Sequence, residues 1–524
     1  MSTELAARSQ RAWFACAIFA TSLSLALARL LRYGLAGYAG TFADDFFYYA
    51  EIARNVAAGS GSTFDGITST NGYQPLWLLI LALLTFLVGP GPQVLIAVSV
   101  LVALASAGCF LASERLAAQR LGRSGALSIS IATCTALLFS KLASQGMELV
   151  LVVPLLFMLL ARSSSHDPGR PYSRTYEMRS GFVSALVVLS RLDSLLLVAP
   201  YAICRWLTAS RSEIPVAARA AHWSFGFCPV GIYLLLNIGL FRRALPVSAE
   251  AKQMKPWSLS WTAPHFPLNA LEHWFVVDAV VVAILIATTL LVCDRQWRER
   301  HELMVPSLAA LAFPFVFYGV HGVLSDWPLW TWHLVPLVVA IPIAIPICLR
   351  SSARWSSAVR SALRWSFPAT RGVLVALVAG PVLAALASAS SPRRDHSLLK
   401  LGQRVADFAR THPGTYAMGD RAGIVAYLVD QPLIQLEGLV GDERMLSHLR
   451  SEDDLVRVLQ DNDVDYYITT RPTRTDGCFS AVEPTLAGPS SPRMRGTFCG
   501  APLLEDRAVD DGVVSLLFAV PNDD

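Results

Sequence analysis

Residues 94–111 read VLIAVSVLVALASAGCFL and contain no charged side chain. A helix needs about 20 predominantly apolar residues to cross the hydrocarbon core of a bilayer, and this run is close to that length. Similar apolar blocks lie at residues 12–31, 276–292, 334–349 and 372–389. Any one of them is compatible with a buried core helix, but so many together are not. We therefore predict an α-helical polytopic membrane protein with about eleven transmembrane helices and additional juxtamembrane helices.

The overall composition supports the same class of protein. Of the 524 residues, 54% are hydrophobic and only 16% are charged, and the mean hydropathy is +0.46. A soluble globular chain carries roughly 25% charged residues. A soluble fold of this size would lack polar surface, so the composition excludes an ordinary water-soluble protein.

The basic residues predict how the chain is oriented in the membrane. With the N-terminus in the cytoplasm, Arg8, Arg11 and the inner loops hold about 20 Lys and Arg, and the outer loops hold about 8. The inner loops on this reading are residues 113–124, 162–179, 205–219, 294–302 and 350–371. This excess of positive charge predicts that the N-terminus is cytoplasmic and that the C-terminal part lies outside the cytoplasm.

Two apolar segments are exceptions to the simple count of spans. Residues 75–88 are too short for a full crossing, and we expect them to form an interfacial or re-entrant helix on the outer side. Residues 182–206 are interrupted by Arg191 and Asp193. We expect this segment to form two short helices that meet near the outer surface.

The composition changes near residues 388–394 (SASSPRR), which divides the chain into a membrane domain, 1–390, and a soluble domain, 391–524. The second part has the patterns of a small α/β domain. Helices are expected at 398–410 and 443–459, and strands at 414–418, 465–470 and 513–520. Cys478 and Cys499 lie in this domain, and a disulfide between them is expected if the domain is extracytoplasmic.

The unusual polar residues gather on the outer side. The richest stretch, residues 42–77, starts with the pair Asp44 and Asp45 directly after the first span and continues into an amphipathic helix suited to the membrane interface. Polar residues beside a membrane are costly and often functional. The simpler alternative is that the acidic pair caps the start of a helix, where a carboxylate is favourable.

An ordered set of motifs resembles the GT-C glycosyltransferases, which take a sugar from a polyprenyl-phosphate donor at the outer membrane face. Within that superfamily the sequence is similar to the bacterial arabinofuranosyl- and mannosyl-type transferases, and the resemblance covers most of the chain. The motifs are DDFFYYAEIARN at 44–55, TNGYQPLW at 70–77, GMELVL at 146–151, LSRLDSLLL at 189–197, LPVSAEAK at 245–252, WHLVPL at 332–337 and GDRAGIVAYLVDQPLIQLEGLVGD at 419–442.

The resemblance implies a GT-C-like fold and a role for several of these residues. Asp44 would be the general base that takes a proton from the acceptor hydroxyl. Asp45 would position the acceptor, organise the loop, or raise the proton affinity of its neighbour. Donor groups would stabilise the departing phosphate, on which negative charge develops. The candidate phosphate ligands are Lys252, Arg191 and His333. The candidate substrate-binding residues are Asn71, Tyr73, Gln74 and Glu148.

Each cationic candidate also has a structural alternative. Lys252 is compatible with a lysine that extends along the membrane interface. Arg191 is compatible with a structural ion pair to Asp193 or Glu148, and His333 with a polar residue at the mouth of a helix. These alternatives remain open at the level of the sequence.

No phosphate-binding loop, dinucleotide fingerprint or zinc-ligand spacing is present in the sequence. A bound cofactor is therefore not expected, and we do not favour a divalent cation at the acidic pair, although carboxylates can hold one.

The predicted partners are a lipid-linked sugar donor, a glycan or glycolipid acceptor and membrane lipids, with no nucleic acid. The predicted function is transfer of a sugar to an envelope glycan or lipid. The alternatives are a transporter or flippase of lipid-linked sugars, an inactive scaffold, or a ligase that uses a diphosphate donor.

Overall fold

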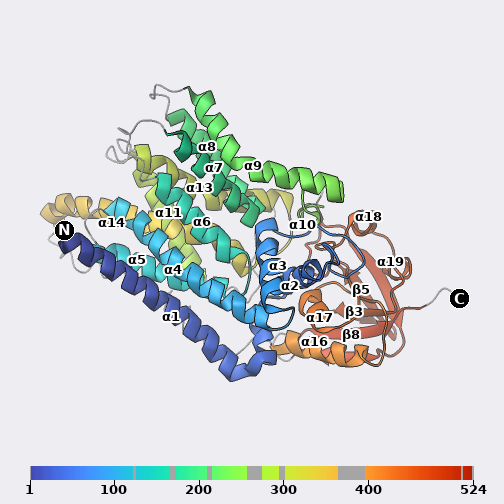
Figure 1. Ribbon diagram of the computed structural model, residues 1–524. Helices are drawn as coiled ribbons and strands as arrows, with labels where there is room; N and C mark the ends of the chain where they lie inside the picture. The colour runs from blue at the N-terminus through green and yellow to red at the C-terminus, as the bar shows by residue number, and fades with distance from the viewer. Residues whose placement is uncertain are drawn as a thin grey trace.

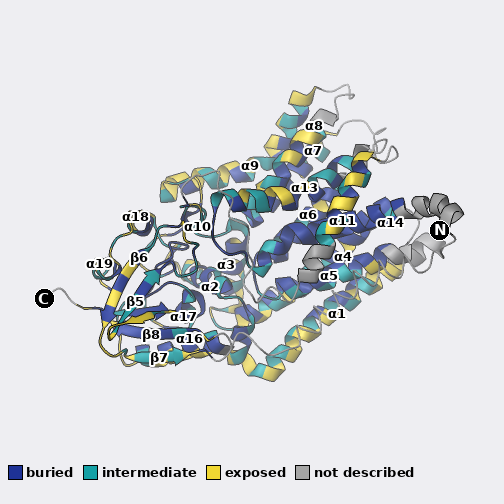
Figure 2. Cartoon of the chain, turned by 180° about the vertical axis from the view of Figure 1, so that it is seen from behind, coloured by how far each residue is buried: buried dark blue, intermediate teal, exposed yellow. Residues whose placement is uncertain are grey.

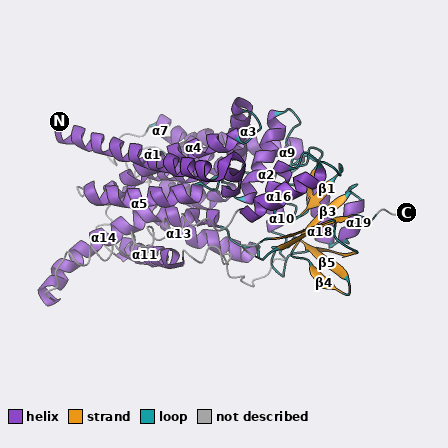
Figure 3. Ribbon diagram, turned by 90° about the horizontal axis from the view of Figure 1, so that it is seen from below, coloured by secondary structure: helices purple, strands orange, loops and turns teal. Residues whose placement is uncertain are grey.

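The computed structural model describes residues 2–121, 125–163, 173–208, 215–255, 274–293, 301–363, 396–508 and 512–521. The membrane part is helical, and the strands are confined to one end of the molecule, next to helices α2, α10 and α16 (Figures 1 and 3). The helices of the membrane part are α1 (Ser2–Tyr38), η1 (Ala39–Thr41), α2 (Asp44–Ala57), α3 (Pro75–Val88), α4 (Gln93–Leu121), α5 (Gly125–Ala143), α6 (Leu149–Ser163), α7 (Arg174–Ser190), η2 (Leu192–Ser194), α8 (Leu195–Thr208), α9 (Val216–Phe241), α10 (Val247–Lys252), α11 (Trp274–Cys293), α13 (His301–Leu324), η4 (Thr331–Leu334) and α14 (Val335–Leu363).

The chain is a multi-pass membrane protein. Five of the described helical segments are long and apolar enough to cross a bilayer: Ser9–Thr41, Gln93–Leu121, Val216–Phe241, Leu303–Leu324 and Thr331–Ser351. Shorter apolar helices accompany them at Pro75–Val88, Ser128–Ala143, Leu149–Arg162 and Val280–Cys293. The total of about eleven spans stays a prediction, because the block at 372–389 and the domain junction at 388–394 lie outside the described residues.

Apolar side chains are exposed along the sides of the helical part, where a lipid-facing surface requires them. Helices α1 and α9 carry exposed residues along much of their length (Figure 2). Leu235 and Leu240 of α9 are each 71% exposed, and Phe86 of α3 is 72% exposed. In water such a surface would be unfavourable, so these residues are consistent with contact with lipid.

The break predicted at residues 182–206 is confirmed. Helix α7 ends at Ser190, the backbone of Arg191 is extended, and the short η2 turn leads into α8. The amide of Arg191 still bonds to the carbonyl of Val187, so the chain leaves the helix only after its last turn is satisfied. The break places Arg191 and Asp193 at the junction of two helices.

Helices α7 and α9 pack closely because each has a glycine at the crossing point. A methyl group added at Gly226 would lie 2.0 Å from the carbonyl oxygen of Met178, and one added at Gly181 would lie 2.0 Å from that of Trp223. Small residues allow helix backbones to approach each other in membranes, where lipid is as apolar as the helices and packing drives association. The glycine pair therefore sets the distance between these two helices.

We expect Gly226→Ala to destabilise the folded protein by about 1–3 kcal/mol, because the new methyl group forces the two backbones apart. The measurement is the apparent Tm of the purified protein in detergent. Gly231→Ala on the same helix is the matched control, since nothing lies within 4 Å of a methyl group there. Equal Tm values for the two variants would show that the glycine contact does not matter.

The C-terminal part is the predicted α/β domain, with two sheets. One has the strand order β2-β1-β3-β8-β7, in which β1 is parallel to β2 and β3, and β8 is antiparallel to β3 and β7. The other is an antiparallel sheet of order β4-β5-β6. The strands are β1 (Tyr416–Met418), β2 (Leu433–Gln435), β3 (Tyr466–Thr470), β4 (Thr473–Thr475), β5 (Cys478–Glu483), β6 (Met494–Cys499), β7 (Leu504–Arg507) and β8 (Val514–Ala519). The helices are α16 (His396–Ala409), α17 (Ala422–Leu428), α18 (Glu443–Ser451) and α19 (Leu455–Gln460).

The strands expected near 414–418, 465–470 and 513–520 are confirmed as β1, β3 and β8. The single helix expected at 443–459 is wrong, because the chain forms α18 and α19 instead. Glu452 adopts a left-handed conformation (φ 52°) that ends α18. Asp454 then starts α19 by accepting a hydrogen bond from the amide of Arg457. Apolar spacing alone did not reveal this interruption.

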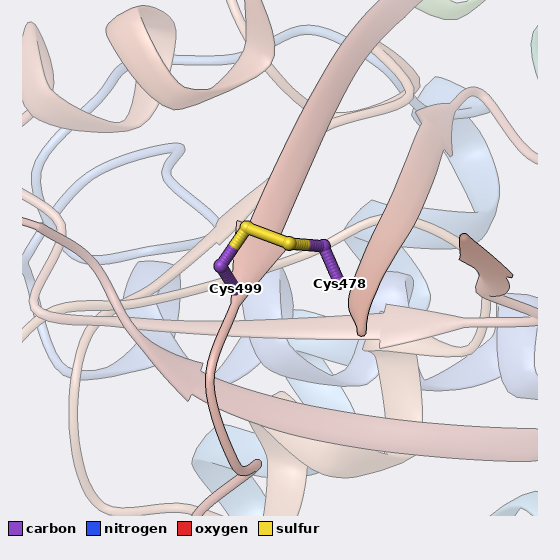
Figure 4. The surroundings of a disulfide bond; sticks show 2 residues. All are labelled: Cys478 and Cys499. Atoms are coloured by element: carbon purple, nitrogen blue, oxygen red, sulfur yellow. A yellow bond between two sulfur atoms is a disulfide. The ribbon is translucent and has the colours of Figure 1, made fainter. Parts of the chain in front are cut away.

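Cys478 and Cys499 are joined as a disulfide (Figure 4). The two residues lie directly opposite each other at one end of the β5–β6 pair. The bond therefore closes the open end of an antiparallel ladder, opposite the connection between the two strands.

Candidate active site

Asp44 and Asp45 form the first turn of α2, but neither caps that helix. Its N-cap is Ala43, which makes no side-chain capping bond. The carboxylate of Asp44 instead accepts hydrogen bonds from two backbone amides of α17, that of Gly423 at 3.1 Å and that of Ile424 at 2.8 Å. Asp44 therefore links the membrane part to the C-terminal domain across 379 positions of sequence.

Asp45 interacts with a different set of groups. Its strongest charge interactions are attraction to Lys252, which lowers its pKa, and repulsion from Glu148 and Asp420, which raises it. Burial outweighs all of these and raises the pKa of Asp45 to about 6. Successive residues of a helix point in different directions. The pair thus presents one carboxylate to α17 and the other to Lys252.

The pKa of Asp44 is raised further, to about 7, chiefly because the carboxylate is buried. The amides of Ile424 and Gly423 oppose this rise by stabilising the charged form, while Asp45 and Asp420 add to it through repulsion. A carboxylate with a pKa near 7 is suited to accept a proton at neutral pH.

Lys252 is the last residue of α10, and α10 rests on the C-terminal domain. Val247 and Ala251 belong to one buried cluster with Leu436, Leu446 and Leu449 of that domain. Ion pairs add to this contact between α10 and the C-terminal domain. Glu250 of α10 binds Arg243 at 2.5 Å and Arg450 of α18 at 3.0 Å, and Arg243 also pairs with Glu443.

The ammonium group of Lys252 lies within electrostatic range of Asp45, Glu148 and His333. Within the described ranges it forms no hydrogen bond and no ion pair closer than 4.0 Å. The amine is therefore held near the acidic pair with its donors still available.

Arg191 bonds to the protein through all three of its guanidinium nitrogens. Its guanidinium donates to Glu148 at 2.6 Å, to Asp193 at 2.8 Å and to the carbonyl of Trp332 at 3.3 Å. All three guanidinium nitrogens take part in these bonds, because Nη2 also donates to Asp193. The ion-pair alternative raised by the sequence describes this geometry. Burial raises the pKa of Glu148, and the charge of Arg191 partly offsets that rise.

Three polar residues that the sequence marks as candidates in the TNGYQP motif bond to protein rather than pointing into open space. Asn71 donates to the carbonyl of Leu245 at 3.1 Å and accepts from the amide of Val247 at 2.9 Å. Gln74 accepts from the amide of Leu192 at 2.9 Å. The hydroxyl of Tyr73 lies 2.9 Å from that of Ser62. The motif therefore ties the start of α10, the helix that bears Lys252, to the α7–α8 junction that bears Arg191.

His333 lies in η4, and its ring orientation is set by the backbone. Nδ1 accepts a hydrogen bond from the amide of Trp330 at 3.0 Å, and the carbonyl of His333 accepts from the hydroxyl of Tyr318 at 3.0 Å. When Nδ1 is an acceptor, the proton of the neutral ring is on Nε2. His333 thus offers an N–H donor on its other side, near Lys252 and Arg191.

Three acidic residues of the C-terminal domain lie near the Asp44–Asp45 pair or near one another: Asp420, Glu437 and Glu483. Sequence reasoning did not single them out. Burial raises the pKa of Glu437 well above its ordinary value, and repulsion from Asp420, Glu483 and the Asp44–Asp45 pair adds to this. Glu437 Oε1 is buried and has no hydrogen-bond partner within the described part of the chain. The only signal in the sequence is an acidic residue inside an apolar stretch, PLIQLEGLV at 432–440.

Among the residues that the structure describes, no three His, Cys, Asp or Glu side chains come together as ligands for a metal ion. The acidic groups here are distributed around α2 and α17 rather than converging on one point. The largest charge interaction of Asp45 is its attraction to Lys252.

No protein-family profile and no curated protein matches the sequence. A solved structure does match: the apo oligosaccharyltransferase of Archaeoglobus fulgidus, with a TM-score of 0.53, 11% identity, and coverage of 87% of this chain and 69% of that one. That protein belongs to the GT-C superfamily. This chain has the GT-C fold.

Two further matches are weaker. The same oligosaccharyltransferase tethered to an acceptor peptide aligns with a TM-score of 0.47 at 11% identity, covering 86% of this chain and 69% of that one. ArnT from Cupriavidus metallidurans aligns with a TM-score of 0.42 at 16% identity, covering 81% of this chain and 87% of that one. In this GT-C fold helices α2 and α10, which carry the acidic pair and Lys252, lie where the helical part meets the C-terminal domain (Figure 1).

The buried carboxylates predict that the folded protein becomes less stable as pH rises. Burial raises the pKa of Asp45 to about 6, Asp44 to about 7 and Glu483 to about 8, from ordinary values of 3.8 for Asp and 4.5 for Glu. The folded chain binds these protons more tightly than the unfolded chain. The stability they contribute is therefore complete below about pH 4 and is lost as pH rises through about 6 to 8.

We expect the apparent Tm in detergent to fall between about pH 5 and pH 8. Glu483→Gln should make the dependence shallower, because glutamine does not titrate but still accepts the hydrogen bond that Tyr467 donates to Glu483. A Tm that rises with pH over this interval would show that other groups dominate.

Proposed function

We propose that the protein is a glycosyltransferase that moves a sugar from a polyprenyl-phosphate-linked donor to an envelope glycan or lipid on the outer face of the membrane. The observation that carries the proposal is the placement, on a GT-C fold, of a buried acidic pair beside an available lysine. One group of this site accepts a proton and another stabilises a phosphate, which are the two requirements of glycosyl transfer.

In the proposed reaction, Asp44 accepts the proton of the acceptor hydroxyl as that oxygen forms a bond to the anomeric carbon of the sugar. The bond from the anomeric carbon to the phosphate oxygen breaks, and the lipid phosphate leaves with the bonding electrons. Lys252, a compact cation, stabilises the negative charge that develops on the phosphate oxygen, and His333 donates a hydrogen bond to the phosphate from Nε2.

We propose that the remaining candidates position these groups. The guanidinium of Arg191 is already bonded on all three nitrogens, so its role is to hold Glu148 and the α7–α8 junction rather than to bind phosphate directly. Asn71 and Gln74 hold the loops on either side of the site. Asp45, close to Lys252, keeps the ammonium group aimed at the donor.

We further propose that the site faces the periplasm of a bacterial cytoplasmic membrane, with the N-terminus in the cytoplasm. The positive charge of the predicted inner loops supports this orientation. The Cys478–Cys499 disulfide supports it independently, because such bonds persist in oxidising compartments.

Asp44→Asn should abolish transfer while leaving the protein folded. The amide is isosteric and its oxygen still accepts a hydrogen bond, but it cannot take a proton, so kcat should fall by about 10²- to 10⁴-fold. The assay follows labelled sugar from polyprenyl-phosphate donors into an envelope extract, with wild type and Asp45→Asn in parallel. Full activity of Asp44→Asn would remove the base assignment. Movement of intact donor across vesicles, with no transfer by wild type, would favour the transporter alternative instead.

Lys252→Met should lower transfer by about 100-fold, because one charge-stabilising group is lost from the departing phosphate. Lys255→Met is the matched control, because the Lys255 amine bonds to the carbonyl of Gly322. Its loss should lower the Tm and leave the rate per folded molecule nearly unchanged. Equal losses of rate in the two variants would show that the position of Lys252 has no special role.

A further inference from the structure

We infer that the C-terminal domain positions the catalytic base. The backbone amides of Gly423 and Ile424 orient and stabilise the carboxylate of Asp44, and Gly423 is a positioning residue for the reaction. This inference rests on the proposed function, in which Asp44 takes the proton.

The first support is the close approach of α17 to Asp44. A methyl group added at Gly423 would lie 2.3 Å from the carbonyl oxygen of Asp44 and 3.1 Å from its carboxyl carbon. The atom in the way is backbone, which cannot swing aside like the end of a long side chain. Only glycine at 423 allows both amides to reach the carboxylate, at 3.1 and 2.8 Å.

The second support is that α17 and α2 are joined at their other ends as well (Figure 1). Arg54, near the end of α2, donates to the carbonyl of Tyr427 at 3.3 Å. The ring of Tyr427 lies 5.1 Å from that of Phe47. With Asp44 bound at one end and Arg54 at the other, α2 cannot rotate or slide against α17 without breaking contacts. The direction of the Asp44 side chain is therefore set by the C-terminal domain.

The third support is electrostatic. Around Asp44 lie Asp45 and Tyr48 on α2 and Asp420 and Glu437 of the C-terminal domain, all of them acidic or neutral groups. Arg421 and Arg471 pair with Asp420, at 3.6 and 2.7 Å, and Lys252 acts on Asp45. The two amides are the groups that favour the charged form of Asp44. Without them its pKa would rise further, and the base would remain protonated over more of the neutral range.

The test compares the pH dependence of kcat/KM in the full-length wild type and Gly423→Ala. Displacing the amides should shift the acidic limb of the profile to higher pH, with the rate recovering as pH increases. Ala426→Gly is the matched control, because it weakens the same helix without entering the space beside Asp44. We expect it to lower the rate without moving the limb. An unmoved limb in Gly423→Ala would overturn the inference.

A second measurement is independent of activity and of whether Gly423→Ala folds. Amide hydrogen exchange at residues 423–424 should be about tenfold faster in Asp44→Ala than in wild type, because both charge-assisted hydrogen bonds are lost. Asp44→Asn should stay closer to wild type, since its carbonyl oxygen still accepts. Unchanged exchange in Asp44→Ala would overturn the inference. Faster exchange in Asp44→Ala, together with a wild-type protein that transfers no sugar from any donor tested, would uphold the contact and overturn the proposed function instead.

Discussion

The junction between α2 and the C-terminal domain buries several carboxylates, and the arrangement of the site depends on how they are kept there. Transfer of an ionised carboxylate from water to a protein interior is costly unless it is paired or hydrogen-bonded. At this junction the described compensation comes from two backbone amides for Asp44, one lysine for Asp45, and hydroxyl donors for Glu483. Because this compensation is incomplete, several of these carboxyl groups have raised pKa values. Such shifted pKa values are common at reactive sites.

The same junction explains why loops far apart in the sequence form one site. The TNGYQP motif acts as a brace: Asn71 bonds to the α9–α10 loop, and Gln74 bonds to the α7–α8 junction. Asn71 satisfies the buried amide of Val247 and Gln74 the part-buried amide of Leu192, so each bond offsets the desolvation of a backbone group as well as of a side chain. The α9–α10 connection, which leads into the helix that bears Lys252, is thereby held together with the junction that bears Arg191.

Much of the fold was predictable because its signals are local. Apolar blocks identify membrane helices, and the Arg191–Asp193 interruption identifies the break between α7 and α8. Short runs rich in apolar, aromatic and β-branched residues identify β1, β3 and β8. The site was predictable only as a set of residues. Which carboxylate meets α17 and which meets Lys252 depends on contacts such as Asp44 with Gly423, which lie 379 positions apart. The engagement of Arg191 with Trp332, 141 positions away, has the same character. No local pattern encodes it.

The packing of α10 on the C-terminal domain has a consequence for how such proteins can diverge. Lys252 belongs by sequence to the membrane part, yet the apolar surface that supports its helix belongs to the C-terminal domain. An exchange of that domain between two homologous chains would carry away the support and leave the lysine behind. Recombination at the domain boundary is thus constrained even though the boundary looks modular in the sequence. The unit that is inherited intact includes both sides of the junction.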